Sequence, residues 1–236
     1  MKYEFNSRIR YSELDEDGKL SVNGLVNYFQ DVSTFQSEQL GVGVEYLKKR
    51  HQAWILSFWQ IVYDRPPRLG ELVTAQTWAY DFKGFMGLRN FALLDQKRTM
   101  LARANSVWVL FDMEKQRPAR MEPEMAKLYE TEPPLDMEYA SRKISLPEGG
   151  EPEVPFYIGK NQLDTNHHVN NGQYIAMAAA YLPEGFAIRE LRAEYRMQAR
   201  LRDEIFPVVC RQKNTVTVEL CNGEGKPYAV VMFLQK

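Results

Sequence analysis

The chain has 236 residues, a formal net charge of −1 and 44% hydrophobic residues. This composition is typical of a globular protein with a substantial core, and it argues against disorder. Because the charge is nearly balanced, nothing draws the chain toward nucleic acid, and we expect no nucleic-acid partner. The N-terminus has no apolar signal-peptide core and no uncharged run is long enough to cross a bilayer, so we expect a cytoplasmic protein without membrane contact.

The two cysteines, Cys210 and Cys221, lie in strand-like sequence without the paired spacing of a zinc site. In a chain without an export signal they are expected to be reduced core residues. The sequence contains no glycine-rich phosphate loop and no metal-ligand spacing. We therefore predict no nucleotide cofactor and no metal.

The first half of the chain predicts a strand, a long helix and four more strands. Residues 2–11 alternate between apolar and charged side chains, which is typical of a strand. Residues 21–41 carry apolar side chains every three or four positions, with Ser21 or Asn23 as the N-cap and Gly41 at the end of the helix. The four following strands are expected at residues 54–63, 72–82, 86–94 and 101–112.

Residues 117–155 read as a connector, with one short helix near 122–129. Seven of the chain's twelve prolines fall here, together with the Gly149-Gly150 pair. Such a composition marks a domain boundary.

After the connector the same order of elements recurs. A strand at 153–158 and a helix at 172–181 precede strands at 188–195, 204–213, 215–222 and 227–234. Leu14-Asp15 precedes the first helix as Leu163-Asp164 precedes the second. Tyr63, Arg68 and Leu69 are likewise echoed by Tyr195, Arg200 and Leu201. We infer an α+β protein built from two copies of one fold.

The run from Asp164 to Asn171 concentrates reactive polar residues before the second helix. It reads Asp-Thr-Asn-His-His-Val-Asn-Asn and holds two of the chain's three histidines. Histidine transfers protons near neutral pH, an amide orients a water or a carbonyl, and a carboxylate orients a histidine, acts as base or attacks directly. Asp and Asn also cap helices, but a turn needs only one or two of them. Their joint occurrence favours a functional site.

The pattern Asp-x-Asn-x-His-Val-Asn-Asn, followed by Tyr174, resembles the motif of the acyl-ACP thioesterases. The resemblance covers essentially the whole chain. It implies a tandem hotdog fold: residues 1–116 form an N-terminal hotdog with the acyl tunnel, 117–152 a linker, and 153–236 a C-terminal hotdog with the catalytic residues. The implied activity is hydrolysis of fatty acyl-ACP to free fatty acid in fatty acid biosynthesis, with acyl carrier protein as partner.

By this resemblance the catalytic residues are Asp164, Asn166 and His168. The sequence departs from the plant members of the family after Glu194-Tyr195-Arg196, where a Glu and a Cys are replaced by Gln198 and Ala199. Gln198 does not titrate, but it can position a water. If the alignment is shifted, the missing carboxylate is expected among Glu190, Glu194 and Glu204. The family pattern also places Phe29, Val32 and Phe35 of the first helix along the acyl tunnel.

Two mechanisms follow from these residues. In one, a water held by Asn166 and Gln198 attacks the thioester, with His168 as the base and Asp164 orienting it. In the other, Asp164 attacks directly and forms an anhydride. An acyl-CoA thioesterase and a non-catalytic acyl-binding protein are the alternatives to the implied function.

Two features of the surface and assembly stay open in the sequence. Two sets of basic residues are candidates for a local patch that would bind the acidic carrier protein: Arg65 with Arg68, and Arg192, Arg196, Arg200 and Arg202. A homodimer is feasible, although two fused hotdogs already supply the pairing that single-hotdog proteins obtain by dimerising.

Overall fold

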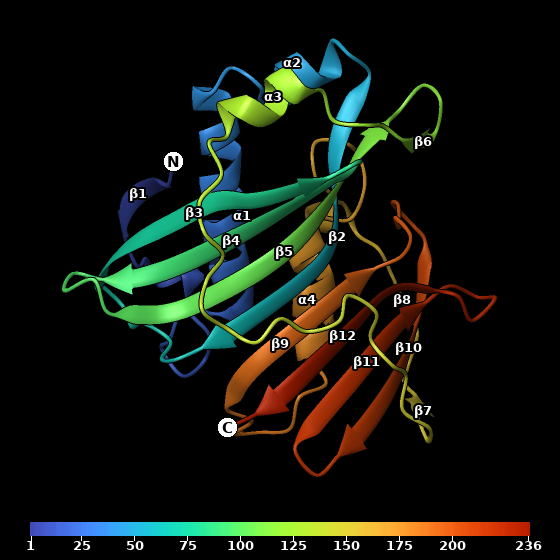
Figure 1. Cartoon of the computed structure of the whole chain (residues 1–236). Helices are drawn as coiled ribbons and strands as arrows, with labels where there is room; N and C mark the ends of the chain where they lie inside the picture. The colour runs from blue at the N-terminus through green and yellow to red at the C-terminus, as the bar shows by residue number, and fades with distance from the viewer. The chain divides into compact units, whose positions relative to one another are not determined.

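The computed structural model describes all 236 residues and divides into two compact units (Figure 1). The first comprises residues 1–57 and 61–140, and the second residues 58–60 and 141–236. In each unit a helix lies against one face of an antiparallel sheet, which is the α+β arrangement predicted from the sequence. No helix is both long and apolar enough to span a membrane.

The first unit contains a five-stranded antiparallel sheet in the order β1-β3-β4-β5-β2. Its strands are β1 (Tyr3–Arg8), β2 (Gln52–Tyr63), β3 (Leu72–Lys83), β4 (Met86–Asp95) and β5 (Met100–Asp112), with the short β6 (Arg117–Pro118) paired to β5. Its helices are α1 (Val22–Gln39), α2 (Val44–Lys48) and α3 (Pro123–Leu128). The sequence predicted all of these except α2 and β6, which are too short to show a periodic pattern.

Helix α1 is the long helix of the first unit. The Ser21 hydroxyl accepts a hydrogen bond from the Gly24 N–H at 3.0 Å and caps its start. Phe29 and Val32 are completely buried against the sheet, where the Phe29 and Phe91 rings are 5.2 Å apart. Phe35 is instead 45% exposed, so it lies outside this core.

The connector packs along the sheet of the first unit and is not a free linker. The Asn90 side chain is buried there, and its Oδ1 accepts hydrogen bonds from the Leu135 N–H and the Tyr139 hydroxyl, both at 3.0 Å. The Trp78 indole N–H donates to the Pro133 carbonyl at 2.9 Å. These bonds satisfy buried polar groups that a solvated linker would leave unpaired.

The second unit has the sheet order β9-β12-β11-β10, and β7 and β8 each pair with β10. The elements are β7 (Glu151–Pro152), β8 (Phe156–Tyr157), α4 (Asn171–Ala179), β9 (Ile188–Tyr195), β10 (Glu204–Gln212), β11 (Thr215–Cys221) and β12 (Pro227–Gln235). The strand expected at 153–158 is only the two-residue β8. Pro152 precedes this segment and Pro155 interrupts it, and proline has no N–H for a continuous ladder.

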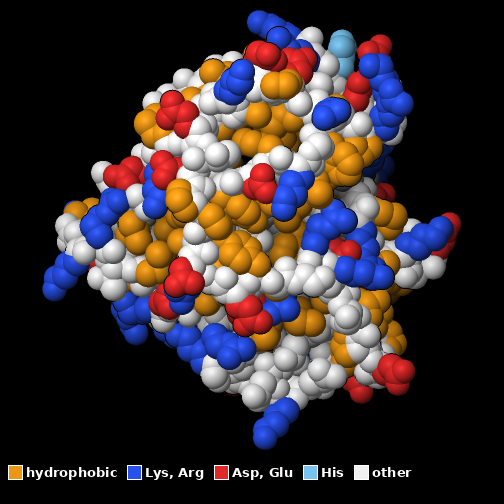
Figure 2. Space-filling view, viewed as in Figure 1, with side chains coloured by type: hydrophobic (Ala, Val, Ile, Leu, Met, Phe, Trp, Pro, Cys, Tyr) orange, Lys and Arg blue, Asp and Glu red, His pale blue; other side chains and the backbone are white.

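Both cysteines are buried and unpaired in the second unit, as predicted. Burial raises the pKa of the Cys221 thiol to about 11, so this thiol stays protonated at neutral pH. Figure 2 shows basic and acidic side chains intermixed over the visible face, in keeping with the net charge of −1.

Candidate active site

The predicted catalytic run folds into a tight hairpin before α4. Leu163 pairs with Val169, and the Asp164 N–H donates to the His168 carbonyl at 2.8 Å. The Asp164 carboxylate accepts hydrogen bonds from the backbone N–H groups of Asn166 at 2.8 Å and His168 at 3.2 Å. One carboxylate oxygen therefore holds the turn closed, as short polar side chains do in Asx turns.

The side chains of this hairpin are open to water. Asn166 is exposed, whereas Asp164 and His168 are half-buried. His167 is exposed and occupies the left-handed region with φ of 61°. The bonds that hold Asp164 come from backbone N–H groups and not from the His168 ring, so the orienting role expected of Asp164 is not formed in this structure.

The first unit contains the same hairpin before α1. The Asp15 carboxylate accepts hydrogen bonds from the N–H groups of Asp17 at 3.0 Å and Lys19 at 2.9 Å. Gly18, with φ of 71°, takes the left-handed position that His167 takes in the second unit. The aspartate turn is therefore a folding feature of both halves, independent of any reaction.

Two of the side-chain differences between the hairpins matter for hydrolysis. Asn166 and His168 stand where the first unit has Asp17 and Lys19. An imidazole exchanges protons near neutral pH, whereas a lysine ammonium stays charged there. An amide both donates and accepts, whereas a carboxylate only accepts. The chemistry suited to hydrolysis is therefore confined to the second hairpin.

The segment that carries Gln198 runs alongside this hairpin. The Val169 N–H donates to the Ala199 carbonyl at 2.9 Å, and His168 pairs with Arg200. Gln198 precedes Ala199 and is exposed. The structure thus brings the backbone of Gln198 beside the residues that the motif had selected.

Two tyrosines, the buried Tyr174 and the half-buried Tyr195, fasten these segments to α4. The Tyr174 hydroxyl accepts a hydrogen bond from the Ala199 N–H at 2.8 Å, and the Tyr195 hydroxyl donates to the Asn171 carbonyl at 2.9 Å. Their rings meet edge-on with centroids 5.9 Å apart. Burial raises the pKa of both hydroxyls far above neutral pH, so both keep their protons. The sequence alone does not show this role, because bonds between distant positions leave no periodic signal.

Asn170 has a structural role at the helix entrance. Its side-chain oxygen accepts a hydrogen bond from the Gly172 N–H at 2.8 Å and caps α4. Ser21 caps α1 at the matching place in the first unit. One amide of the motif is therefore already used by the fold.

The alternative carboxylates are engaged elsewhere. Glu190 accepts from Arg192 at 2.6 Å, and Glu194 accepts from Arg196 at 2.9 Å. Glu204 lies in β10, where it pairs with Tyr157 of β8. Glu190 and Glu194 are therefore already engaged by arginines within the protein, which disfavours either as the replacement for the missing family carboxylate.

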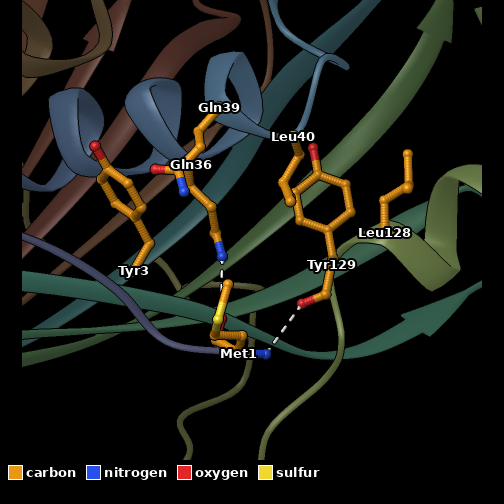
Figure 3. A pocket seen from close by; sticks show the side chains of 7 residues that line it. All are labelled: Met1, Tyr3, Gln36, Gln39, Leu40, Leu128 and Tyr129. Carbon is orange, nitrogen blue, oxygen red and sulfur yellow. Dashed lines mark hydrogen bonds between the residues drawn. The ribbon is translucent and has the colours of Figure 1, made fainter.

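A small pocket lies in the first unit (Figure 3). It has an empty volume of about 240 Å³. The Gln36 side chain donates to the Met1 carbonyl at 3.2 Å, and the Met1 ammonium contacts the Tyr129 carbonyl at 3.5 Å. The lining comprises Met1, Tyr3, Gln36, Gln39, Leu40, Leu128 and Tyr129. None of the predicted site residues lines this pocket, so it is not the candidate active site.

Residues 1–129, more than half of the chain, match the family model described as the acyl-ACP thioesterase N-terminal domain. The chain belongs to the acyl-ACP thioesterase family. All matched residues except 58–60 lie in the first unit, and the family model does not reach the hairpin of Asp164, Asn166 and His168. Their roles stay predictions.

Curated plant thioesterases are similar over most of this chain. The chloroplastic palmitoyl-acyl carrier protein thioesterase of Gossypium hirsutum is 27% identical over 211 residues, covering 82% of this chain and 51% of that protein. Oleoyl-acyl carrier protein thioesterase 2 of Arabidopsis thaliana is 23% identical, covering 92% of this chain and 65% of that protein. The chain thus spans about half to two thirds of the length of these relatives.

Solved structures confirm the tandem hotdog fold. An acyl-ACP thioesterase of Bacteroides thetaiotaomicron matches with a TM-score of 0.92 at 22% identity, covering 100% of this chain and 98% of that chain. The 12:0-ACP thioesterase of Umbellularia californica matches with a TM-score of 0.85 at 18% identity, covering 100% and 97%. The smaller DHNA-CoA thioesterase of Staphylococcus aureus covers only 54% of this chain but 88% of its own, with a TM-score of 0.50 and 14% identity. A chain of that size therefore matches about half of this one.

Proposed function

We propose that this protein hydrolyses the thioester of fatty acyl-ACP, releasing a free fatty acid and acyl carrier protein. Membership of the family supports the reaction class. The observation that carries the proposal is the asymmetry between the hairpins: the second presents Asn166 and His168 where the first presents Asp17 and Lys19. The place in fatty acid biosynthesis and the acyl tunnel in the first unit belong to the same proposal.

The proposed reaction begins with a water held by the amides of Asn166 and Gln198. His168 takes a proton from this water as its oxygen bonds to the acyl carbon, and the carbonyl oxygen becomes an oxyanion. When the oxyanion collapses, the carbon–sulfur bond breaks and His168 returns the proton to the departing thiolate. The products are a fatty acid and a free thiol.

Direct attack by Asp164 is less favoured by the geometry. One of its carboxylate oxygens accepts two backbone hydrogen bonds and is occupied in closing the turn. A single turnover in oxygen-18 water tests direct attack by water. Label in Asp164 overturns this route, whereas label confined to the fatty acid is the result expected when water attacks the acyl carbon.

Thiol release from matched acyl-ACP and acyl-CoA substrates, over a range of chain lengths, tests the function. We expect higher kcat/KM for acyl-ACP, and His168→Ala should lower kcat by at least about a hundredfold, the scale of a lost acid–base group. Lys19→Ala, at the matching position of the first hairpin, is the control and should keep full activity. Near-normal turnover by His168→Ala would remove His168 from the mechanism.

The comparisons favour neither alternative function. An acyl-CoA thioesterase would reverse the substrate preference in this assay. A non-catalytic acyl-binding protein would bind fatty acid without releasing thiol. A cytoplasmic location, the absence of nucleic-acid and membrane partners, and a homodimer all stay open predictions.

A further inference from the structure

The turn Arg200–Leu201–Arg202 lies at the edge of the candidate active site, and we call it the arginine turn. The backbone of Arg200 forms an antiparallel β-bridge with the backbone of His168 in the catalytic hairpin. Both arginine side chains are exposed, and Leu201 between them is 38% exposed. The turn therefore presents two positive charges and one apolar side chain to solvent beside the reacting residues.

The backbone of this turn is better suited to glycine than to arginine. Arg202 has φ of 70°, in the left-handed region that is unfavourable for a residue with a Cβ. The first unit has Gly70 at the matching place, with φ of 79°. The Arg202 N–H donates to the Ile158 carbonyl at 3.0 Å as the Gly70 N–H donates to the Ile9 carbonyl at 2.9 Å. Glycine would thus form the same turn without strain.

The charges of the arginine turn are not used inside the protein. Arg192 and Arg196, which the sequence grouped with them, form ion pairs with Glu190 and Glu194. No ion pair or side-chain hydrogen bond involves the guanidinium of Arg200 or Arg202. These two positive charges therefore remain available to a partner outside the chain.

Arg98 is also an arginine in the left-handed region, but its guanidinium forms an ion pair within the protein. It has φ of 65°, and its guanidinium pairs with Glu4 at 2.9 Å. An internal ion pair thus accompanies the strain at Arg98, whereas the Arg202 guanidinium forms none.

We propose that the arginine turn is the docking surface for the acidic carrier protein that delivers the acyl group. This inference rests on the proposed function and adds the surface that recognises the carrier. Arg200 and Arg202 supply charge complementary to an acidic protein, and Leu201 supplies a small apolar contact. Its place beside His168 lets one docked carrier present its thioester to the hairpin.

Arg202→Gly is the sharpest test, because it copies Gly70 and relieves strain. We expect an unchanged or higher Tm, an unchanged kcat, and a KM for acyl-ACP raised about two- to fivefold, the scale of one exposed charge pair. Adding Arg200→Gln should raise KM further and weaken its dependence on salt. Arg202→Lys should retain most of the affinity. Arg98→Gly, a left-handed arginine in the other unit, should leave KM unchanged.

Two smaller substrates identify what the arginines recognise. Turnover of a neutral acyl-N-acetylcysteamine and of acyl-phosphopantetheine should be insensitive to Arg202→Gly, because neither carries the protein. An equal rise in KM for acyl-phosphopantetheine would assign the arginines to the phosphate and overturn carrier docking. An unchanged KM for acyl-ACP in the Arg200→Gln, Arg202→Gly double variant would overturn it as well.

The failure of the proposed function has a separate signature. If the wild-type protein hydrolyses none of the three substrates, the hydrolase assignment fails, and docking is measured directly by calorimetric titration with acyl-ACP. Weaker binding by the double variant would still support the arginine turn. Binding of equal strength, or no binding by the wild type, would overturn it.

Discussion

The hydroxyl of Tyr174 accepts a hydrogen bond from the backbone N–H of Ala199, 2.8 Å away, inside the second unit. At the matching positions the first unit has Leu25 and Pro67. The Pro67 carbonyl accepts a hydrogen bond from the Leu20 N–H, as the Ala199 carbonyl accepts one from the Val169 N–H. Proline has no N–H and therefore needs no acceptor. The first half thus has no N–H to satisfy at this position, whereas the second half satisfies its N–H with the Tyr174 hydroxyl. This hydrogen bond holds the segment that begins with Gln198.

Tyr174→Phe is expected to lower the free energy of unfolding by about 1–3 kcal/mol, because it leaves a buried N–H without a partner. Tyr174→Leu combined with Ala199→Pro copies the first unit and should recover most of this loss. Urea unfolding of the wild type and both variants measures the effect. Equal stability of the Phe variant and the wild type would show that another acceptor replaces the hydroxyl.

Asp164→Asn should separate the folding role of this residue from any role in the reaction. An amide oxygen can still accept the two N–H groups of the turn, so stability should change by less than about 1 kcal/mol. If the carboxylate assists His168, kcat should fall at least about tenfold, and thiol release measures it. Asp15→Asn is the matched control and should leave both quantities unchanged. Full activity of Asp164→Asn would confine Asp164 to the turn.

Asn170→Ala and Ser21→Ala remove the caps of α4 and α1. Each should lower the free energy of unfolding by about 1 kcal/mol, the usual effect of a lost N-cap. Only Asn170→Ala should also lower kcat/KM, because only α4 begins directly after the catalytic hairpin. Chemical unfolding and thiol release together test the pair. Equal loss of activity in both variants would point to a general effect of stability.

Glu194 is expected to contribute to stability that is lost in acid. Burial would raise the pKa of Glu194, but hydrogen bonds from Arg196 and from the Ile144 N–H outweigh it and hold the pKa below its ordinary value of 4.5. A lowered carboxyl pKa in the folded state stabilises the protein above the unfolded value. This contribution is therefore complete above about pH 4.5 and disappears as the pH falls through the folded value.

The measurement for Glu194 is the free energy of unfolding between pH 7 and pH 3. The wild type should lose stability more steeply in acid than Glu194→Gln, and the two should converge at the lowest pH. Glu224→Gln is the control, because its ion pair with Lys226 is fully exposed to screening and should add little. Parallel curves for the wild type and Glu194→Gln would contradict the assignment.

Most helices and strands were predictable because burial repeats along the chain with the period of each element. The pattern at residues 188–195 predicted β9 at its observed bounds, and the apolar spacing after Ser21 predicted α1 to within two residues. The echo of Leu14-Asp15 in Leu163-Asp164 predicted the duplication. The polar run from Asp164 identified the candidate site, because such side chains are rare together in a simple turn.

Contacts between distant positions decided the rest. Sequence could not show that both Asp15 and Asp164 close turns, which makes the aspartate alone a poor sign of catalysis. Nor could it separate the ion-paired Arg196 from the unpaired Arg202, because pairing depends on which side chains folding brings within a few ångströms. Local sequence patterns indicate which residues are buried. The hydrogen-bond and ion-pair partners of a residue are decided only by the tertiary packing of the chain.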